Sequence, residues 1–136
     1  MLQQRPSTIL TLLFFAVALL LAACGSGANS VATPTPSLSA EAAQGQALFQ
    51  GKGRCATCHA LSPETIIVGP SLAGIATHAA SRVAGLSAAE YLEASILFPD
   101  SYIVPGFENQ QMPTTLAKEL SVPEVEALVA YMLTLD

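Results

Sequence analysis

The strongest constraint on this chain is a five-residue motif, Cys55-Ala56-Thr57-Cys58-His59. Its two thiols are three positions apart, so both lie on one turn of chain, and a histidine follows directly. This Cys-x-x-Cys-His spacing is the signature of c-type haem attachment, in which the thiols add to the two vinyl groups of one haem and the histidine is aimed at the iron. The motif predicts one covalent haem, held by Cys55 and Cys58 with His59 as an iron ligand.

Other uses of the motif are less favoured. A zinc site would need a fourth ligand of suitable spacing, and the only other cysteine is Cys24, which belongs to an export signal. A thioredoxin-like redox pair expects a βαβ setting, and a local disulfide leaves His59 without a role. A structural lipoprotein without haem is a further alternative, which a test for covalent haem would decide.

The N-terminal residues predict export and a lipid anchor. The apolar run from Ile9 to Ala23 is too short to cross a bilayer, which takes roughly 20 residues, so residues 1–23 are expected to be a signal peptide. Its end, Leu21-Ala22-Ala23-Cys24, resembles the lipobox of bacterial lipoproteins, which implies lipidation of Cys24. The alternative is an ordinary signal peptide followed by a stray cysteine. We expect anchoring at the extracytoplasmic face of the cell membrane.

Two further segments follow the signal. Residues 24–39 are rich in Gly, Ser, Thr and Pro and carry no charge, which predicts a flexible linker. Residues 40–136 are expected to form the single folded domain. This domain has no tryptophan, and its supply of core residues is small for its size. A large apolar cofactor enclosed by short helices would complete the core.

The domain is expected to be all-α, because apolar residues recur at helical spacing and no alternating run appears. One helix is predicted over about residues 40–50, with Ser39 as its N-cap. Capping boxes predict helix starts at Ser87, ending before Pro99, and at Ser121. The last helix has one apolar face, formed by Val125, Leu128, Val129, Met132 and Leu133.

The charge of the chain limits its partners. The formal net charge is −5, and loss of Arg5 with the signal peptide changes it to −6. Such an acidic protein is not expected to bind nucleic acid, whose phosphates demand clusters of Lys and Arg. A basic docking partner suits it better. Lys52 and Arg54 flank the motif, and they form either a small positive rim for docking or two ordinary solvated side chains.

A histidine-ligated iron needs a second axial ligand for electron transfer, because an open position invites oxygen or peroxide chemistry. Met112 is the favoured candidate, since it lies in an irregular stretch between Pro99 and Thr115 that could cover the opposite haem face. Met132 lies on the apolar stripe of the last helix, where it is better explained as core. His78 is the rival ligand.

Residues 40–136 resemble the class I cytochromes c, and especially the cytochrome c domains attached to subunit II of haem-copper oxidases. The resemblance implies a small all-α fold of short helices and loops wrapped around one covalently bound haem. The segments that carry the resemblance, in this order and spacing, are Cys55-Ala-Thr-Cys-His59, Val68-Gly-Pro-Ser-Leu-Ala-Gly74, Gly85-Leu-Ser, Tyr91-Leu-Glu-Ala-Ser-Ile-Leu97 to Pro99, Tyr102-Ile-Val and Met112-Pro113.

The resemblance also implies roles for individual residues. The Pro70 carbonyl is expected to accept a hydrogen bond from the free ring nitrogen of the ligating histidine. Arg82 and Tyr102 match positions that reach a haem propionate in similar domains, although a solvated arginine and a packed tyrosine are equally compatible with the sequence. The first and last helices are expected to cross through a small residue and aromatic partners, which here would be Gly45, Phe49 and Tyr131.

The predicted function is a membrane-anchored carrier of single electrons, with iron ligated by His59 and Met112, and not an enzyme. It would serve respiratory or photosynthetic complexes. The expected donor is a quinol-oxidising complex, and the expected acceptor is a terminal oxidase, a reductase or a reaction centre. The alternative function is a haem sensor or a peroxidase-like enzyme with an open or labile sixth ligand position.

Overall fold

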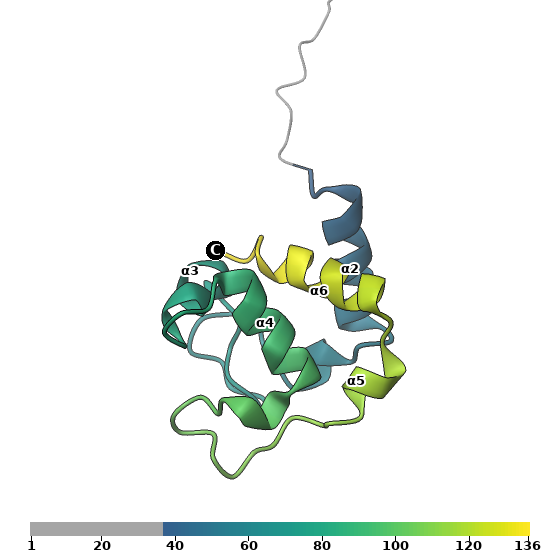
Figure 1. Ribbon diagram of the computed structural model, residues 1–136. Coiled ribbons are helices and arrows are strands. Elements are labelled where there is room, and N and C mark those ends of the chain that lie inside the picture. Colours follow the sequence, from purple (N-terminus) through teal and green to yellow (C-terminus); the bar gives the residue numbers. More distant parts are fainter. Residues whose placement is uncertain (1–36) are drawn as a thin grey trace, which may run out of the picture. The chain divides into compact units, whose positions relative to one another are not determined.

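The computed structural model describes residues 37–136, whose backbone forms helices and loops without a β-strand. Three helices are about three turns long: α2 (Ala40–Gln50), α4 (Ala88–Leu97) and α6 (Val122–Met132) (Figure 1). The remaining elements are the single-turn α-helices α3 (Ile75–His78) and α5 (Leu116–Glu119) and the 3₁₀ turns η1 (Cys55–Thr57), η2 (Ala79–Ser81) and η3 (Pro99–Ser101). The prediction of an all-α domain with three main helices is confirmed.

Several predictions concern segments that the structure does not describe. The predicted signal peptide (1–23), the lipidation site Cys24 and the linker (24–39) up to residue 36 lie outside the described residues, and they stay predictions. None of the helices in the described part combines the length and the hydropathy that crossing a membrane requires.

The helix starts follow the capping signals in the sequence. The Ser39 hydroxyl accepts a hydrogen bond from the Ala42 N–H at 3.1 Å at the start of α2. In the box that opens α4, the Ser87 N–H donates to the Glu90 carboxylate at 2.8 Å and the Ser87 hydroxyl accepts from the Glu90 N–H. A second box opens α6 at Ser121. Each cap satisfies N–H groups that the first helical turn leaves without partners.

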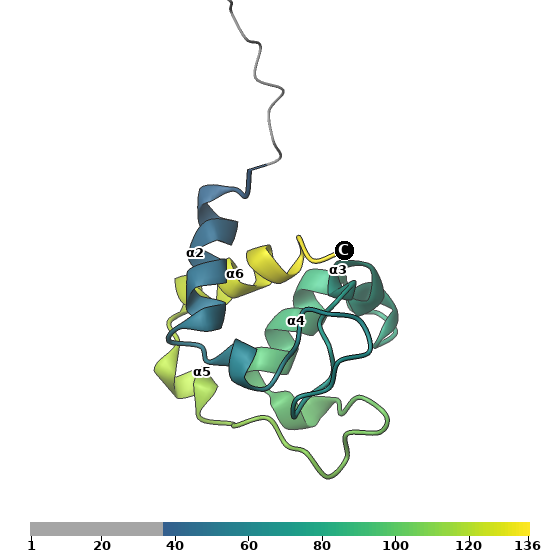
Figure 2. The same ribbon diagram turned by 180° about the vertical axis from the view of Figure 1, so that it is seen from behind.

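The first and last helices cross where a glycine removes the side chain between them (Figures 1 and 2). A Cβ at Gly45 would overlap the Ala127 carbonyl and lie 2.8 Å from the Tyr131 Cβ, so α2 and α6 approach with their backbones in contact. One turn along, Phe49 and Tyr131 pack edge to face with ring centroids 5.5 Å apart. The crossing predicted for Gly45, Phe49 and Tyr131 is confirmed.

The buried face of α6 forms the centre of the core, and α4 packs against it. Of the five residues predicted for this face, four are buried, and Leu133 is 38% exposed. The prediction for Leu133 was wrong because α6 ends at Met132 and the chain then turns toward α3. The turn ends with the Leu135 carbonyl accepting a hydrogen bond from the Ala76 N–H at 3.1 Å, and Leu135 packs against the core instead.

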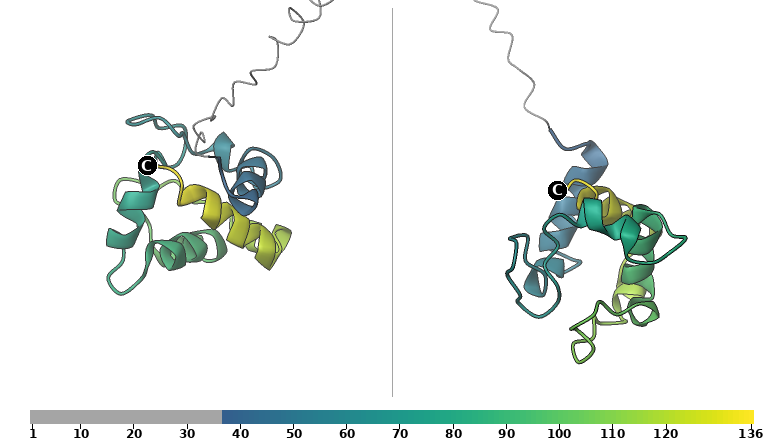
Figure 3. Two further views of the ribbon diagram at one scale, coloured as in Figure 1. Left: turned by 90° about the horizontal axis from the view of Figure 1, so that it is seen from above. Right: turned by 90° about the vertical axis from the view of Figure 1, so that its left-hand side faces the viewer.

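Two loops leave the helices and approach the same part of the molecule (Figure 3). One is the teal segment that follows η1, and the other is the green segment between α4 and α5. The first loop runs from η1 to α3 and the second from α4 to α5, and residues of α4 and α6 line the space between them. This arrangement positions the site described next.

Candidate functional site

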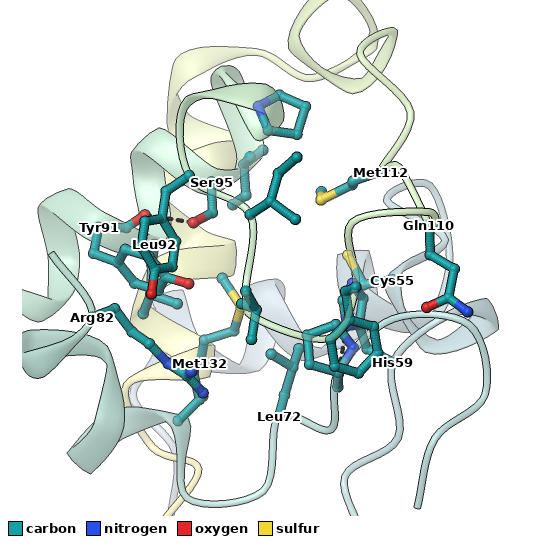
Figure 4. Close-up of a pocket in the computed structure, with 18 of the residues that line it drawn as sticks. Cys55, His59, Leu72, Arg82, Tyr91, Leu92, Ser95, Gln110, Met112 and Met132 are labelled. Atoms are coloured by element: carbon teal, nitrogen blue, oxygen red, sulfur yellow. Dashed lines mark hydrogen bonds between the residues drawn. The ribbon is translucent and has the colours of Figure 1, made fainter.

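A pocket lies between the Cys-x-x-Cys-His motif, α4, α6 and the loop before α5 (Figure 4). It encloses about 960 Å³ of empty space when its open mouth is counted. Its lining is mostly apolar and includes Leu72, Ile75, Tyr91, Leu92, Ile96, Tyr102, Ile103, Val104, Phe107 and Met132. A flat apolar group therefore suits this pocket.

The motif forms a tight turn at one side of the pocket. The N–H groups of Cys58 and His59 both donate to the Cys55 carbonyl, at 3.1 and 2.9 Å, which folds the five residues into a single turn. Arg54 enters this turn with φ +54°, a conformation that glycine adopts more readily. Cys55 lines the pocket, and neither Cys55 nor Cys58 is in a disulfide.

Burial raises the pKa of the Cys55 thiol from 9.0 to about 11, because the desolvated site disfavours the thiolate, and the neighbouring Cys58 adds to the effect. The thiolate is the reactive form of cysteine. Cys55 in this folded structure is therefore a weak nucleophile at neutral pH.

His59 is held in one orientation by the chain that follows the motif. Its Nδ1 lies 2.8 Å from the Pro70 carbonyl oxygen. A carbonyl only accepts hydrogen bonds, so Nδ1 carries the proton and Nε2 keeps its lone pair. The hydrogen bond predicted for Pro70 is confirmed. His59 also lines the pocket, so its ring presents a metal-ligating nitrogen there.

Gly69 is a part of the site that sequence reasoning missed. A Cβ on this buried glycine would lie 2.5 Å from Cε1 of His59 and 3.0 Å from its Nδ1, so the imidazole packs directly on the Gly69 backbone. The Gly69 N–H also donates to the Cys58 carbonyl at 2.9 Å. The Gly-Pro pair in the sequence was the available signal, since glycine permits such close approach.

Met112 and the two alternative ligands differ in where they lie. Met112 extends into the pocket from the loop before α5, on the side away from His59 (Figure 4). Met132 also lines the pocket but is 94% buried in the core cluster, as its predicted core role requires. His78 is exposed on α3 and does not line this pocket. The thioether that faces His59 across the pocket is therefore that of Met112.

Arg82 and Tyr102 both line the pocket, and both also border a second, more polar hollow that includes His78 and Ser81. The Arg82 Nε is buried without a hydrogen-bond partner among the described residues. A buried N–H without an acceptor is costly, so this nitrogen fits an acceptor supplied by a bound group. Tyr102 packs edge to face on Tyr91, with ring centroids 5.8 Å apart.

The two cations beside the motif, Lys52 and Arg54, each form an ion pair with an acidic residue. The Lys52 ammonium lies 2.7 Å from the Glu124 carboxylate, and the Arg54 guanidinium lies 2.8 Å from the Glu119 carboxylate. Both cations are thus neutralised by acidic residues of α5 and α6. These partners are 72 and 65 residues away in the sequence, so no local signal predicted either ion pair.

The donor set fits a covalently attached haem. The Cys55 thiol, the His59 imidazole and the Met112 thioether line an apolar pocket, and Cys58 follows Cys55 in the same turn. A guanidinium nitrogen of Arg82, which also lines the pocket, is buried without an acceptor among residues 37–136. The competing zinc reading finds no support, because no group of three His, Cys, Asp or Glu residues within 37–136 is arranged to hold a metal ion. The helical fold likewise lacks the βαβ setting of a thioredoxin-like pair.

Comparison with known proteins agrees with this geometry. Residues 42–136 match the family model described as Cytochrome c. No curated protein matches the chain. The family match includes the motif, the Gly-Pro pair, Met112, the helices α4 and α6, and all of α2 except its first two residues. Because it spans well over half of the sequence, the chain belongs to the cytochrome c family.

Proposed function

We propose that this protein is a membrane-tethered carrier of single electrons whose iron is ligated by His59 and Met112. Membership of the cytochrome c family supplies the coarser statement: the protein binds one haem c covalently through Cys55 and Cys58 and transfers electrons. The observation that carries the proposed ligation is the placement of His59 and Met112 on different sides of one apolar pocket.

Haem supplies an iron centre that changes its charge by one electron, and the chain determines how that centre is held. The Pro70 carbonyl fixes the His59 ring through Nδ1 and increases the basicity of the imidazole. Gly69 leaves room for the ring to lie against the backbone. Together they direct Nε2 into the pocket.

Met112 supplies the second ligand and the closure of the pocket. Methionine paired with histidine raises the reduction potential, and an occupied sixth position prevents oxygen from reaching the iron. Apolar residues on α4, such as Leu92 and Ile96, exclude water from the same space. This combination supports electron transfer over the alternative of a sensor or a peroxidase-like enzyme.

Arg82 is proposed to bind an anionic substituent of the haem. Its Nε is buried without a partner among residues 37–136, and a carboxylate such as a propionate would satisfy it. Tyr102, which borders the same two hollows, is proposed to contribute its hydroxyl. Most of the other residues that line the pocket are apolar, and the polar ones are Ser71, Ser95, Asp100, Gln110 and Gln111.

The absorption spectrum of the oxidised holoprotein tests the ligation. We expect a charge-transfer band from a thioether to the ferric iron, and we expect Met112→Ala to abolish it. The matched control is His78→Ala, which alters the rival ligand and should leave the band unchanged. High-spin features in the unmutated protein would instead favour the sensor or peroxidase-like function.

We also propose that Cys24 carries the lipid anchor and places the domain at the extracytoplasmic face of the cell membrane. The lipobox resemblance of residues 21–24 supports this. More than one acyl chain makes detachment rare, because each buried methylene contributes about 0.8 kcal/mol. Metabolic labelling with a radioactive fatty acid should mark the protein, and Cys24→Ser should remove the label.

The proposed donor is a quinol-oxidising complex, and the proposed acceptor is a terminal oxidase, a reductase or a reaction centre. Tethering supports such a shuttle because confinement near the membrane increases the effective concentration without new contacts. In membranes from the source cell, an inhibitor of the quinol-oxidising complex should prevent reduction of the haem by quinol. Unchanged reduction would remove that complex as the donor.

A further inference from the structure

We infer that Ser71 is a positioning residue for the iron-ligating histidine: its hydroxyl keeps the Pro70 carbonyl directed at His59, and it thereby tunes the reduction potential. This inference rests on the proposed ligation of the iron by His59. Ser71 follows Pro70 directly in the loop from η1 to α3, where it is partly buried and lines the pocket.

The Pro70 carbonyl needs support from outside its own residue. The proline nitrogen carries no hydrogen, so Pro70 donates no backbone hydrogen bond. The carbonyl belongs to the peptide unit between Pro70 and Ser71, and within residues 37–136 the N–H of that unit donates to no backbone carbonyl. Rotation of this unit would swing the oxygen away from His59 Nδ1, which lies 2.8 Å from it.

Backbone hydrogen bonds hold the loop on both sides of this peptide unit but do not hold the unit itself. Before it, the Gly69 N–H donates to the Cys58 carbonyl at 2.9 Å. After it, the Leu72 N–H donates to the Ala60 carbonyl at 2.8 Å. A planar peptide unit between two fixed points keeps one soft motion, which is rotation about the line that joins its ends. Resistance to this rotation has to come from a side chain.

The Ser71 hydroxyl supplies that resistance. It donates to the Ser62 carbonyl at 2.8 Å and accepts a hydrogen bond from the Ala73 N–H at 3.2 Å, so it connects two parts of the loop. The Ala60 carbonyl is a weaker second acceptor, at 3.4 Å. Because these partners hold the serine side chain, the peptide unit that precedes it cannot turn freely, and its carbonyl stays directed at the histidine.

The effect on the reduction potential passes through the imidazole. A hydrogen bond from Nδ1–H to a carbonyl increases the basicity of the ring, and a more basic ligand favours ferric over ferrous iron. Loss of the Ser71 hydroxyl should weaken this bond and so favour the reduced form. Because only part of one hydrogen bond is lost, we expect the equilibrium to shift about two- to fivefold, a rise of about 20–40 mV for a one-electron couple.

Voltammetry of the holoprotein tests this expectation, with Ser71→Ala raising the midpoint potential by that amount. The matched control is Ser62→Ala, which removes a hydroxyl from the same loop but keeps the backbone carbonyl that accepts the Ser71 hydrogen bond. It should leave the potential unchanged. Ser71→Thr keeps the hydroxyl, so its potential should lie closer to that of the unmutated protein. A Ser71→Thr variant that matches Ser71→Ala would contradict the role given to the hydroxyl.

Magnetic resonance of the reduced holoprotein, made with isotope-labelled histidine, measures the positioning itself. The chain has two histidines, so the exposed His78 serves as an internal reference for the ring N–H signal of His59. In Ser71→Ala we expect the Nδ1–H signal of His59 to move upfield and its exchange with solvent to accelerate about two- to fivefold, because the hydrogen bond to Pro70 is weaker. Ser62→Ala should show neither change.

The two measurements together separate positioning from other roles. An unchanged potential in Ser71→Ala, with or without a loss of stability, would leave Ser71 a structural residue of the loop and overturn the inference. A shifted potential with an unmoved Nδ1–H signal would also overturn it, because Ser71 would then act on the haem directly. An equal shift in Ser62→Ala would do the same. Absence of a reversible one-electron wave in the unmutated protein would instead overturn the proposed function.

Discussion

Replacing Gly69 with alanine isolates the contact that positions the iron-ligating histidine. The new Cβ would lie 2.5 Å from Cε1 of His59, and ordinary contacts begin at about 3.4 Å. The ring must therefore retreat by about 0.9 Å, or the loop must move by the same amount. Gly69 itself has no positive φ, so the backbone accepts alanine without strain and the effect is purely steric.

This displacement has two costs. Overpacking a tight site costs about 1–3 kcal/mol of the free energy of unfolding. A retreat of the ring would also stretch the 2.8 Å hydrogen bond from His59 Nδ1 to the Pro70 carbonyl beyond its usual range, which costs about 1 kcal/mol. On the proposed ligation, the same movement changes the direction of the iron–imidazole bond.

The assay combines guanidinium unfolding of the holoprotein with its absorption spectrum. The matched control is Gly85→Ala: Gly85 has φ +88° and no neighbour within 4 Å of a Cβ, so alanine there costs about 1–2 kcal/mol through the backbone alone. We expect both variants to be destabilised, but only Gly69→Ala to alter the ligand bands. Unchanged bands in Gly69→Ala would refute the role given to this glycine.

The remaining predictions concern the frame around the site. Gly45→Ala should lower the free energy of unfolding by about 1–3 kcal/mol in denaturant titrations despite its better helix propensity, because its Cβ overlaps the Ala127 carbonyl. A change below 0.5 kcal/mol would contradict this packing. Leu128→Ala, at a fully buried position, should cost about 2–5 kcal/mol by the same method, and a smaller loss would mean that the core collapses onto the cavity. The Lys52 ammonium, with added hydrogen bonds from Ser121, lowers the pKa of Glu124 from 4.5 to about 2. This carboxylate therefore stabilises the fold above about pH 4.5, and its contribution is lost as the pH falls toward 2. Glu124→Gln should destabilise the protein at pH 7 and make stability less dependent on pH between 4.5 and 2, and parallel pH profiles would contradict the ion pair.

Local signals in the sequence predicted much of this fold. Ser39, Ser87 and Ser121 each start a helix through a side-chain hydrogen bond that reaches only two or three residues along the chain. Such bonds depend on neighbours in the sequence, so the sequence is enough to find them. The single-turn helices α3 and α5 carry no side-chain cap at their first residues, and they were not predicted.

Part of the site was also predicted, because its signal is local in the sequence. The motif at residues 55–59 is a local pattern, and its turn is closed by hydrogen bonds to Cys55 within four residues. The hydrogen bond from His59 to Pro70 was expected from family resemblance, and the structure has it. Gly69 was missed because its importance depends on the His59 ring that lies against it.

The sequence alone determined two things, the chemistry of haem attachment and the start of each main helix. Both depend on spacings of a few residues: two thiols and an adjacent histidine in the first case, and capping residues in the second. The tertiary structure decided which distant groups meet. It paired Lys52 with Glu124 and Arg54 with Glu119, and it brought Met112 into the pocket that His59 lines. Charges and ligands act over a few ångströms of space, and only the folded chain sets those separations.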